Sequence, residues 1–190
     1  MKMDDDEPVA VPEPVVGHAR RNVLIGAGVS AAVVGLGAAL WLRREEPAMA
    51  VPPVEGFWEL RWDTPGGTKL AMKTFRGKPL LLNFWATWCA PCIEELPLIN
   101  DFYRQNGPKG WQVVGLALDK LAPVQSFMRA HPIDFPVGMA GLAGGELGRS
   151  LGNLGGSLPF SVVIGASGTV LTRKIGRLSV EDLAVWAQLK

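Results

Sequence analysis

Two cysteines placed just after a strongly apolar stretch constrain the fold of this chain more than any other feature. Cys89 and Cys92 are its only cysteines, and they follow the apolar run Leu80–Trp85 closely. The run has the length and composition of a buried strand, whereas the residues from Ile93 onward have a helical pattern. The cysteine pair is therefore expected where a strand passes into a helix.

This position favours a reactive thiol at Cys89. The unpaired backbone N–H groups and the positive end of the helix dipole stabilise a thiolate at a helix N-terminus, which lowers the pKa of a cysteine there. Residues three apart on a helix have Cβ atoms roughly 5 to 6 Å apart, so a small adjustment brings Cys92 within disulfide distance of Cys89. The spacing predicts a dithiol that opens and closes without refolding of the domain.

Two structural interpretations of the pair are weaker. A structural zinc site needs four ligands, and the only histidines, His18 and His131, are not spaced to act as ligands together with the cysteines. A purely structural disulfide across so short a loop would remove little entropy from the unfolded chain. We therefore interpret the pair as a thiol–disulfide redox centre, for which no cofactor and no metal ion is implied.

The composition is that of one globular domain with an appended segment. Of the 190 residues, 48% are hydrophobic and 19% are charged, which lies in the range of folded proteins. The 19 basic and 18 acidic residues nearly cancel, and no basic cluster indicates a nucleic-acid partner.

The N-terminal third divides into three predicted segments. Residues 1–22 are rich in proline and acidic side chains and are expected to be a disordered cytoplasmic tail. Residues 23–42 contain no charge, and twenty such residues match the ~30 Å hydrocarbon core of a bilayer. Residues 43–55 follow as a linker, and residues 56–190 form the folded domain.

Two fates remain open for residues 23–42. The basic pair Arg43-Arg44 after the apolar run favours an uncleaved transmembrane anchor. The pair Arg20-Arg21 before it, together with Ala48-Met49-Ala50 after it, also fits a cleavable twin-arginine export signal. Either fate carries the domain out of the cytoplasm.

The domain itself alternates predicted strands and helices. Trp58, Leu60 and Trp62 alternate with polar residues, which indicates a half-buried strand that turns at 64–67 and returns as a hairpin over 69–72. Further strands are predicted at 80–85, 111–118, 135–137, 160–164 and 169–173. Helices are predicted from the cysteine pair to residue 105, at 123–130, at 146–151, and after a capping Ser179. This order implies an α/β fold with a parallel crossover.

The chain resembles the thioredoxin superfamily, specifically the TlpA-like thiol–disulfide oxidoreductases that are tethered to membranes of bacterial envelopes and are related to redoxins. The resemblance runs from about Gly56 to Trp186 and is carried by the segment 83–92, by Glu95 and Pro97, and by the segment 156–159. It implies a thioredoxin fold, in which helices flank a central mixed sheet, here with an added N-terminal β-hairpin.

The resemblance also assigns roles to single residues. It implies that Cys89 is the exposed nucleophile, that Cys92 is the resolving thiol, and that Pro159 is a cis-proline that helps to align the substrate backbone. Leu158, which precedes this proline, is larger than expected and is placed in the substrate groove. Trp88 is expected to contact substrate because it adjoins the nucleophile.

An acidic residue completes the predicted site. By the resemblance, Glu95 lies near the buried cysteine and assists proton transfer, although a solvated helix carboxylate is the alternative. Cytoplasmic thioredoxins have a buried aspartate where this chain has Asn83. Any acid–base role therefore passes to Glu95 or to water.

The implied function is reduction of disulfides in periplasmic proteins. The expected partners are disulfide-containing envelope proteins and a membrane electron donor related to the thiol transporters DsbD or CcdA, with residues 23–42 in the bacterial inner membrane. One alternative substrate is the cysteine pair of a cytochrome c haem-attachment site. An alternative of another class is a copper-binding delivery module that uses both cysteines and His131.

Overall fold

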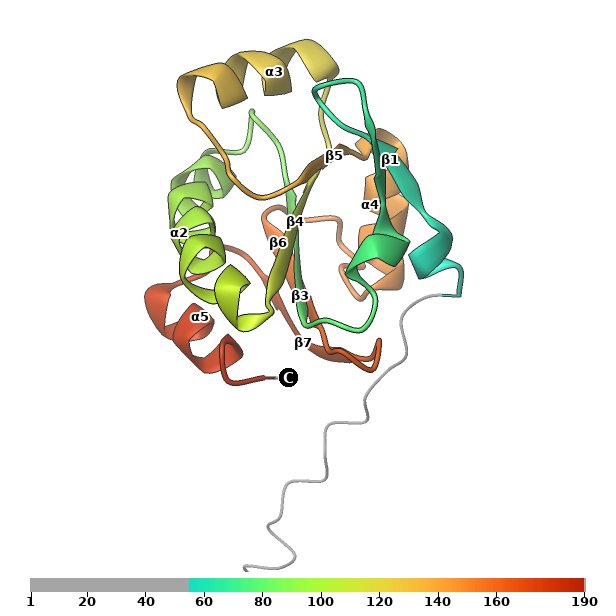
Figure 1. The fold of residues 1–190 in the computed structure, drawn as a ribbon. Coiled ribbons are helices and arrows are strands. Elements are labelled where there is room, and N and C mark those ends of the chain that lie inside the picture. The colour runs from blue at the N-terminus through green and yellow to red at the C-terminus, as the bar shows by residue number, and fades with distance from the viewer. Residues whose placement is uncertain (1–54, 190) are drawn as a thin grey trace, which may run out of the picture. The chain divides into compact units, whose positions relative to one another are not determined.

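The computed structural model describes residues 55–189, which form one seven-stranded mixed sheet with helices on both faces (Figure 1). The strands are β1 (Arg61–Asp63), β2 (Lys69–Ala71), β3 (Leu80–Trp85), β4 (Gln112–Ala117), β5 (Val137–Met139), β6 (Phe160–Ile164) and β7 (Val170–Ile175). The α-helices are α2 (Ala90–Asn106), α3 (Leu121–Ala130), α4 (Gly141–Ser150) and α5 (Val180–Trp186). Short 3₁₀ helices occupy η1 (Phe57–Glu59), η2 (Met72–Phe75) and η3 (Gly107–Lys109).

Strand β3 lies inside the sheet, whose order is β2-β1-β5-β4-β3-β6-β7. It pairs in parallel with β4, from Leu80 opposite Gln112 to Trp85 opposite Ala117, and antiparallel with β6. All six of its residues are buried. A strand covered on both faces has a nearly continuous apolar sequence, which is why β3 is predicted to the residue.

The two faces of the sheet carry separate hydrophobic clusters. Side chains of a strand alternate between faces, so Leu81 and Trp85 pack under α2, α3 and α5, whereas Leu82 and Phe84 pack against α4 and the two N-terminal 3₁₀ helices. Figure 1 shows α2 and α5 on one side of the sheet and α4 on the other. Asn83 lies on the face that α2 covers, and it is the one polar residue of β3.

The N-terminal region of the domain differs in part from its prediction. Residues 61–63 and 69–71 do pair antiparallel. The strand does not include Trp58 and Leu60, however, because residues 57–59 form a 3₁₀ helix. Phe57 is buried at 1% exposure and packs edge-to-face against the ring of Trp58. This packing holds residues 57–59 in a helical turn. The alternation of apolar and polar residues over 58–62 did not predict that turn.

Two helices begin earlier than predicted. Helix α3 starts at Leu121, so Pro123 is its third residue and not its first. A proline is accepted there because the first N–H groups of a helix have no helical partner. Helix α4 starts at Gly141 and not at Glu146, because its glycines serve close packing and do not form a loop. Gly144, for example, would place a Cβ only 3.0 Å from the side chain of Leu118.

The predicted N-terminal segments fall outside the described residues, including the membrane segment 23–42. Within residues 55–189, no helix is both long and apolar enough to cross a membrane.

Two adjacent glycines of α4 should respond oppositely to alanine. A Cβ at Gly144 would lie 2.5 Å from the Cβ of Ala140, which cannot move aside without the backbone. Gly144→Ala should therefore lower the free energy of unfolding by about 1 to 3 kcal/mol. A Cβ at Gly145 meets only Leu118, at 3.9 Å, so Gly145→Ala should raise it by about 0.4 to 1 kcal/mol. Urea unfolding followed by tryptophan fluorescence measures both, and equal effects would contradict the packing of α4.

Candidate active site

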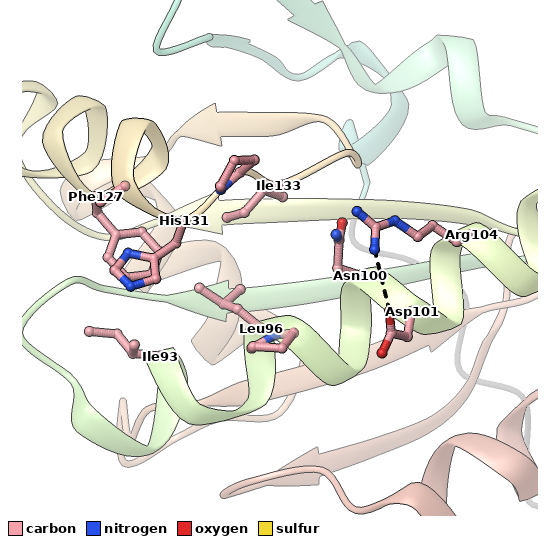
Figure 2. Close-up of a pocket in the computed structure, with 11 residues that line it drawn as sticks. Ile93, Leu96, Asn100, Asp101, Arg104, Phe127, His131 and Ile133 are labelled. Carbon is pink, nitrogen blue, oxygen red and sulfur yellow. Dashed lines mark ion pairs between the residues drawn. The ribbon is translucent and has the colours of Figure 1, made fainter.

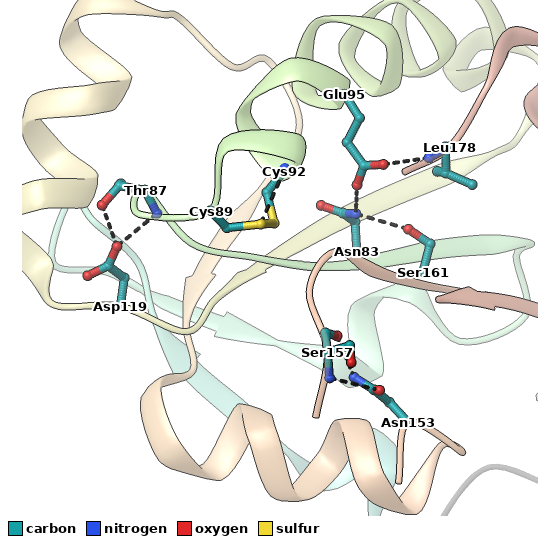
Figure 3. The surroundings of a disulfide bond; sticks show 10 residues. All are labelled: Asn83, Thr87, Cys89, Cys92, Glu95, Asp119, Asn153, Ser157, Ser161 and Leu178. Carbon is teal, nitrogen blue, oxygen red and sulfur yellow. Dashed lines mark hydrogen bonds between the residues drawn. A yellow bond between two sulfur atoms is a disulfide. The ribbon is translucent and has the colours of Figure 1, made fainter. Parts of the chain in front are cut away.

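The two cysteines form a disulfide at the N-terminus of α2, as the spacing predicts (Figure 3). Their Cα atoms are 5.3 Å apart. Cys89 is the N-cap residue of the helix, and the backbone N–H of Cys92 donates to its Sγ at 3.3 Å. When the bond is reduced, this N–H and the helix dipole stabilise a thiolate on Cys89. The arrangement can therefore supply a nucleophilic sulfur.

The two sulfurs differ in access to solvent. Cys92 is fully buried, whereas Cys89 keeps 6% of its surface exposed. The expectation of an exposed nucleophile therefore needs correction for the oxidised state, because only a small part of Cys89 can be reached. The neighbouring Trp88 is 68% exposed. A partner that approaches the disulfide would thus meet Trp88 together with the edge of Cys89.

An aspartate that was not predicted fixes the loop before the cysteines. One carboxylate oxygen of Asp119 accepts hydrogen bonds from the backbone N–H of Thr87, at 2.8 Å, and from the Thr87 hydroxyl (Figure 3). The other oxygen accepts from the backbone N–H of Lys120 at 2.7 Å. Burial alone would raise the pKa of Asp119, but these hydrogen bonds outweigh it and lower the pKa. The carboxylate therefore stays ionised as it holds the loop.

The strand register could have revealed this contact. Trp85 lies opposite Ala117 in the parallel pair β3–β4. Thr87 and Asp119 are each two residues further along, so they leave the same edge of the sheet side by side.

Glu95 is buried beneath the cysteine-bearing turn and is not a solvated helix carboxylate. It is 1% exposed and lies on α2, three residues after Cys92. Its oxygens accept from the side-chain amide of Asn83 and from the backbone N–H of Leu178, both at 2.7 Å (Figure 3).

The environment of Glu95 moves its pKa toward neutral pH. Burial raises the pKa of Glu95 to about 7, because the charged form loses its hydration. The hydrogen bonds from Leu178 and Asn83 and the positive charges of Arg177 and Lys174 act in the opposite direction but do not cancel the effect of burial. Glu95 can therefore gain or lose a proton in the physiological range.

Asn83 is the hub of this buried cluster. Its Nδ2 donates to Glu95 and also to the hydroxyl oxygen of Ser161 at 2.9 Å, whereas its Oδ1 is buried with no hydrogen-bond partner among the described residues. Ser161 lies on β6 opposite Asn83 in the antiparallel pair. Neither the link to Ser161 nor the unpaired oxygen follows from the sequence.

The loop that leads to Pro159 is also ordered by a side chain. The Leu158–Pro159 peptide bond is cis, as the resemblance predicts. Just before it, the side chain of Asn153 donates to the carbonyl of Ser157 at 2.8 Å and accepts from its N–H at 3.2 Å (Figure 3). Asn153 was not predicted as part of the site. A short-range Asn–Ser pair before a proline is the signal that could have indicated it.

His131, the candidate copper ligand, lies at the end of α3 and stacks on Phe127, with ring centroids 4.6 Å apart. It lines a cavity of about 360 Å³ between α2 and α3. Figure 2 shows the lining residues, among which Arg104 on α2 pairs with Asp101. Within residues 55–189, no three His, Cys, Asp or Glu side chains are grouped so that they could hold a metal ion.

Known proteins match most of this domain. The Redoxin family model matches residues 49–186. The thiol-disulfide oxidoreductase ResA of Bacillus thuringiensis subsp. konkukian is 35% identical over 118 residues, which cover 62% of this chain and 66% of that protein. The sporulation thiol-disulfide oxidoreductase A of Bacillus subtilis is 27% identical, over 60% of this chain and 68% of that protein. The match thus spans just under two thirds of the length of the first relative.

Solved structures support the fold. A thiol:disulfide interchange protein of the thioredoxin family from Chlorobium tepidum superposes with a TM-score of 0.63 at 30% identity, over 74% of this chain and 96% of that chain. StoA from Bacillus subtilis superposes with a TM-score of 0.57 at 26% identity, over 73% of this chain and 99% of that chain. The predicted thioredoxin-like α/β fold is confirmed.

Burial of Glu95 should make the stability of the oxidised protein depend on pH. Between about pH 4.5, where an unfolded glutamate titrates, and pH 7, only the folded protein keeps the Glu95 proton. Stability should therefore fall as the pH rises through this window, by about 3 kcal/mol in total, and then level off. Glu95→Gln should remove this loss, whereas Glu94→Gln, an exposed neighbour paired with Arg177, should retain it. Urea unfolding at several pH values tests this, and parallel curves for wild type and Glu95→Gln would contradict it.

Proposed function

The chain belongs to the Redoxin family, and we propose that it is a protein thiol–disulfide oxidoreductase that reduces disulfides of proteins outside the cytoplasm. The observation that carries the proposal is the Cys89–Cys92 disulfide at the N-terminus of α2, next to the exposed Trp88. A bond in this position is both activated and open to a partner on one side.

The reaction is a two-step exchange of disulfides. In the reduced protein, the Cys89 thiolate attacks one sulfur of a substrate disulfide, and the other substrate sulfur leaves as a thiolate. Cys92 then loses its proton and attacks the Cys89 sulfur of the mixed disulfide, which releases the second substrate thiolate. Two electrons pass to the substrate, and the Cys89–Cys92 disulfide remains.

Glu95 accepts the proton that Cys92 loses. It lies one helical turn after Cys92, in the same buried region, and its raised pKa suits a base that works near neutral pH. The Asn83 amide can form a hydrogen bond with Glu95 whether the Glu95 carboxyl group is ionised or protonated. Its Nδ2 donates to the carboxylate, and rotation of the amide by 180° would turn the unpaired Oδ1 toward a carboxyl proton and toward the Ser161 hydroxyl.

Trp88, Leu158 and Pro159 form the substrate contact around Cys89. Trp88 supplies an exposed aromatic surface next to the nucleophile. Leu158 is half-buried and lines the same groove as Trp88. The cis Leu158–Pro159 bond sets the direction of the backbone that leads into β6.

The domain works in the bacterial envelope, held to the inner membrane by residues 23–42. The support for this proposal is the uncharged length of that segment and the basic pair after it. The environment outside the cytoplasm is oxidising, so a reductase there must be reduced again after each turnover. A membrane thiol transporter of the DsbD or CcdA type fits this role, and disulfide-containing envelope proteins are the substrates.

Replacement of the resolving cysteine should trap the substrates. In Cys92→Ser the mixed disulfide on Cys89 cannot be resolved, so expression of the full chain in bacteria should yield covalent adducts that dithiothreitol releases. Cys89→Ser is the matched control and should yield none, because the nucleophile is absent. Non-reducing electrophoresis and mass spectrometry identify the adducts. The proposal fails if Cys92→Ser traps nothing under conditions in which the equivalent variant of a known oxidoreductase does.

The N-terminal segment should keep the protein in the membrane. The full chain is expected in the membrane fraction after carbonate extraction, with its N-terminus intact, and replacement of Arg20-Arg21 by Lys-Lys should not change this. Recovery of a soluble protein that starts after residue 50, with export blocked by the Lys-Lys replacement, would instead establish a cleaved twin-arginine signal.

A further inference from the structure

A groove of about 620 Å³ opens beside the disulfide, between the active-site loops and α4. Two of its lining residues are chain neighbours of the redox site, because Trp88 directly precedes Cys89 and Leu158 directly precedes the cis-proline. The remaining lining comes from the end of β4 and from α4, and it includes Leu118, Lys120, Leu142 and Arg149.

The groove has an apolar floor and an apolar rim. Leu118 and Leu158 are half-buried and pack on the core cluster beneath α4, so they form a fixed floor. Trp88 and Leu142 are 68% and 93% exposed, and they form the rim. Gly145 keeps the space between floor and rim open, since a Cβ there would meet only Leu118. Exposed large apolar side chains that gather beside a reactive centre mark a binding surface.

The lining of the groove has a net positive charge. Lys120 and Arg149 are exposed, and neither takes part in an ion pair within the part of the chain that the structure describes. Asp119 is the only acidic residue of the lining, and its oxygens accept hydrogen bonds from Thr87 and from the backbone N–H of Lys120. The positive charge of Lys120 also lowers the pKa of Asp119. Arg149 is therefore the cation most available to a ligand, whereas the charge of Lys120 is partly offset by Asp119.

We propose that this groove selects disulfide substrates in which a large apolar side chain and a carboxylate lie close to the reactive cysteine in an extended segment. The proposal rests on the proposed function and names its substrate class. The apolar side chain occupies the space between Trp88, Leu142 and Leu158, and the carboxylate lies against Arg149, with Lys120 at the other side. Charge complementarity of this kind favours encounter with acidic segments and disfavours basic ones.

The groove fits a polypeptide. Its volume suits one or two side chains, and an extended backbone that passes Cys89 would place alternate side chains into it. A partly exposed ion pair contributes about 0.2 to 1 kcal/mol. This corresponds to a preference of about 1.4- to fivefold at low salt, which screening reduces as the ionic strength rises.

The test uses the full chain, reduced beforehand, in single-turnover reactions with synthetic disulfide peptides. The peptides carry a leucine next to the reactive cysteine and differ only in Glu or Gln two residues from that leucine, on either side of it, so that both side chains point to the same side of an extended backbone. Wild type should reduce at least one Glu peptide about 1.4- to fivefold faster than its Gln partner at low salt, with the ratio falling toward one at high salt. Arg149→Gln should bring this ratio close to one.

Arg76→Gln is the matched control, because Arg76 is also exposed and precedes β3, at the opposite end of that strand from the cysteines. It should retain the wild-type ratio. Leu142→Ala should lower the rate for peptides with leucine more than for peptides with alanine in its place. If wild type reduces all peptides at equal rates, or if Arg76→Gln and Arg149→Gln act alike, the substrate preference is refuted while the proposed function stands. If no peptide is reduced where a thioredoxin control reduces them all, the proposed function fails as well.

Discussion

The parallel pairing of β3 with β4 is the constraint on which the rest of the site depends. It brings two strand ends to the same edge of the sheet, so that the loop at Thr87 and the carboxylate of Asp119 leave side by side. The hydrogen bonds between them fix the entry into α2, and with it the position of Cys89 over the helix N-terminus. A rigid approach of this kind keeps the helix dipole directed at one sulfur, and this alignment gives the two cysteines different electrostatic environments.

Below that sulfur lies Glu95, a carboxyl group whose burial opposes its ionisation. Two hydrogen bonds limit the cost, because the Leu178 N–H and the Asn83 amide donate to Glu95. Burial on the α2 side of the core acts in the opposite direction, since it excludes the water that would return the pKa of Glu95 to normal. The result is a group balanced between two protonation states. A fully hydrated carboxylate would stay ionised, and a carboxyl with no donor would stay protonated, so neither could exchange a proton with a buried thiol near pH 7.

The sequence predicted those parts of the protein that depend on local pattern. Strands β3 and β6 were placed to the residue because burial on both faces makes their apolar runs unbroken. The cysteine pair follows from a short spacing, and Ser179 was correctly predicted to cap the last helix. Asn153 and Asp119 were missed because their roles depend on partners that become neighbours only through the fold. The burial of Glu95 could not be predicted either, because the sequence does not show whether a single carboxylate on a helix is buried or exposed.

The glycines after β5 show most clearly why part of the fold could not be predicted from the sequence. A cluster of glycines after β5 is typical of a loop, yet here it forms the first half of α4. Gly141 has a φ of +48°, which favours glycine at the helix start, and Gly144 allows the helix to approach Ala140 and Leu118 more closely than a side chain would permit. Gly141 and Gly145 of the same helix line the groove that Trp88 and Leu158 border. The cysteines thus lie at the start of α2, whereas α4 contributes Leu142 and Arg149 to the wall of the groove. Under the proposed substrate preference, changes in α4 should alter substrate choice without altering the sulfur chemistry.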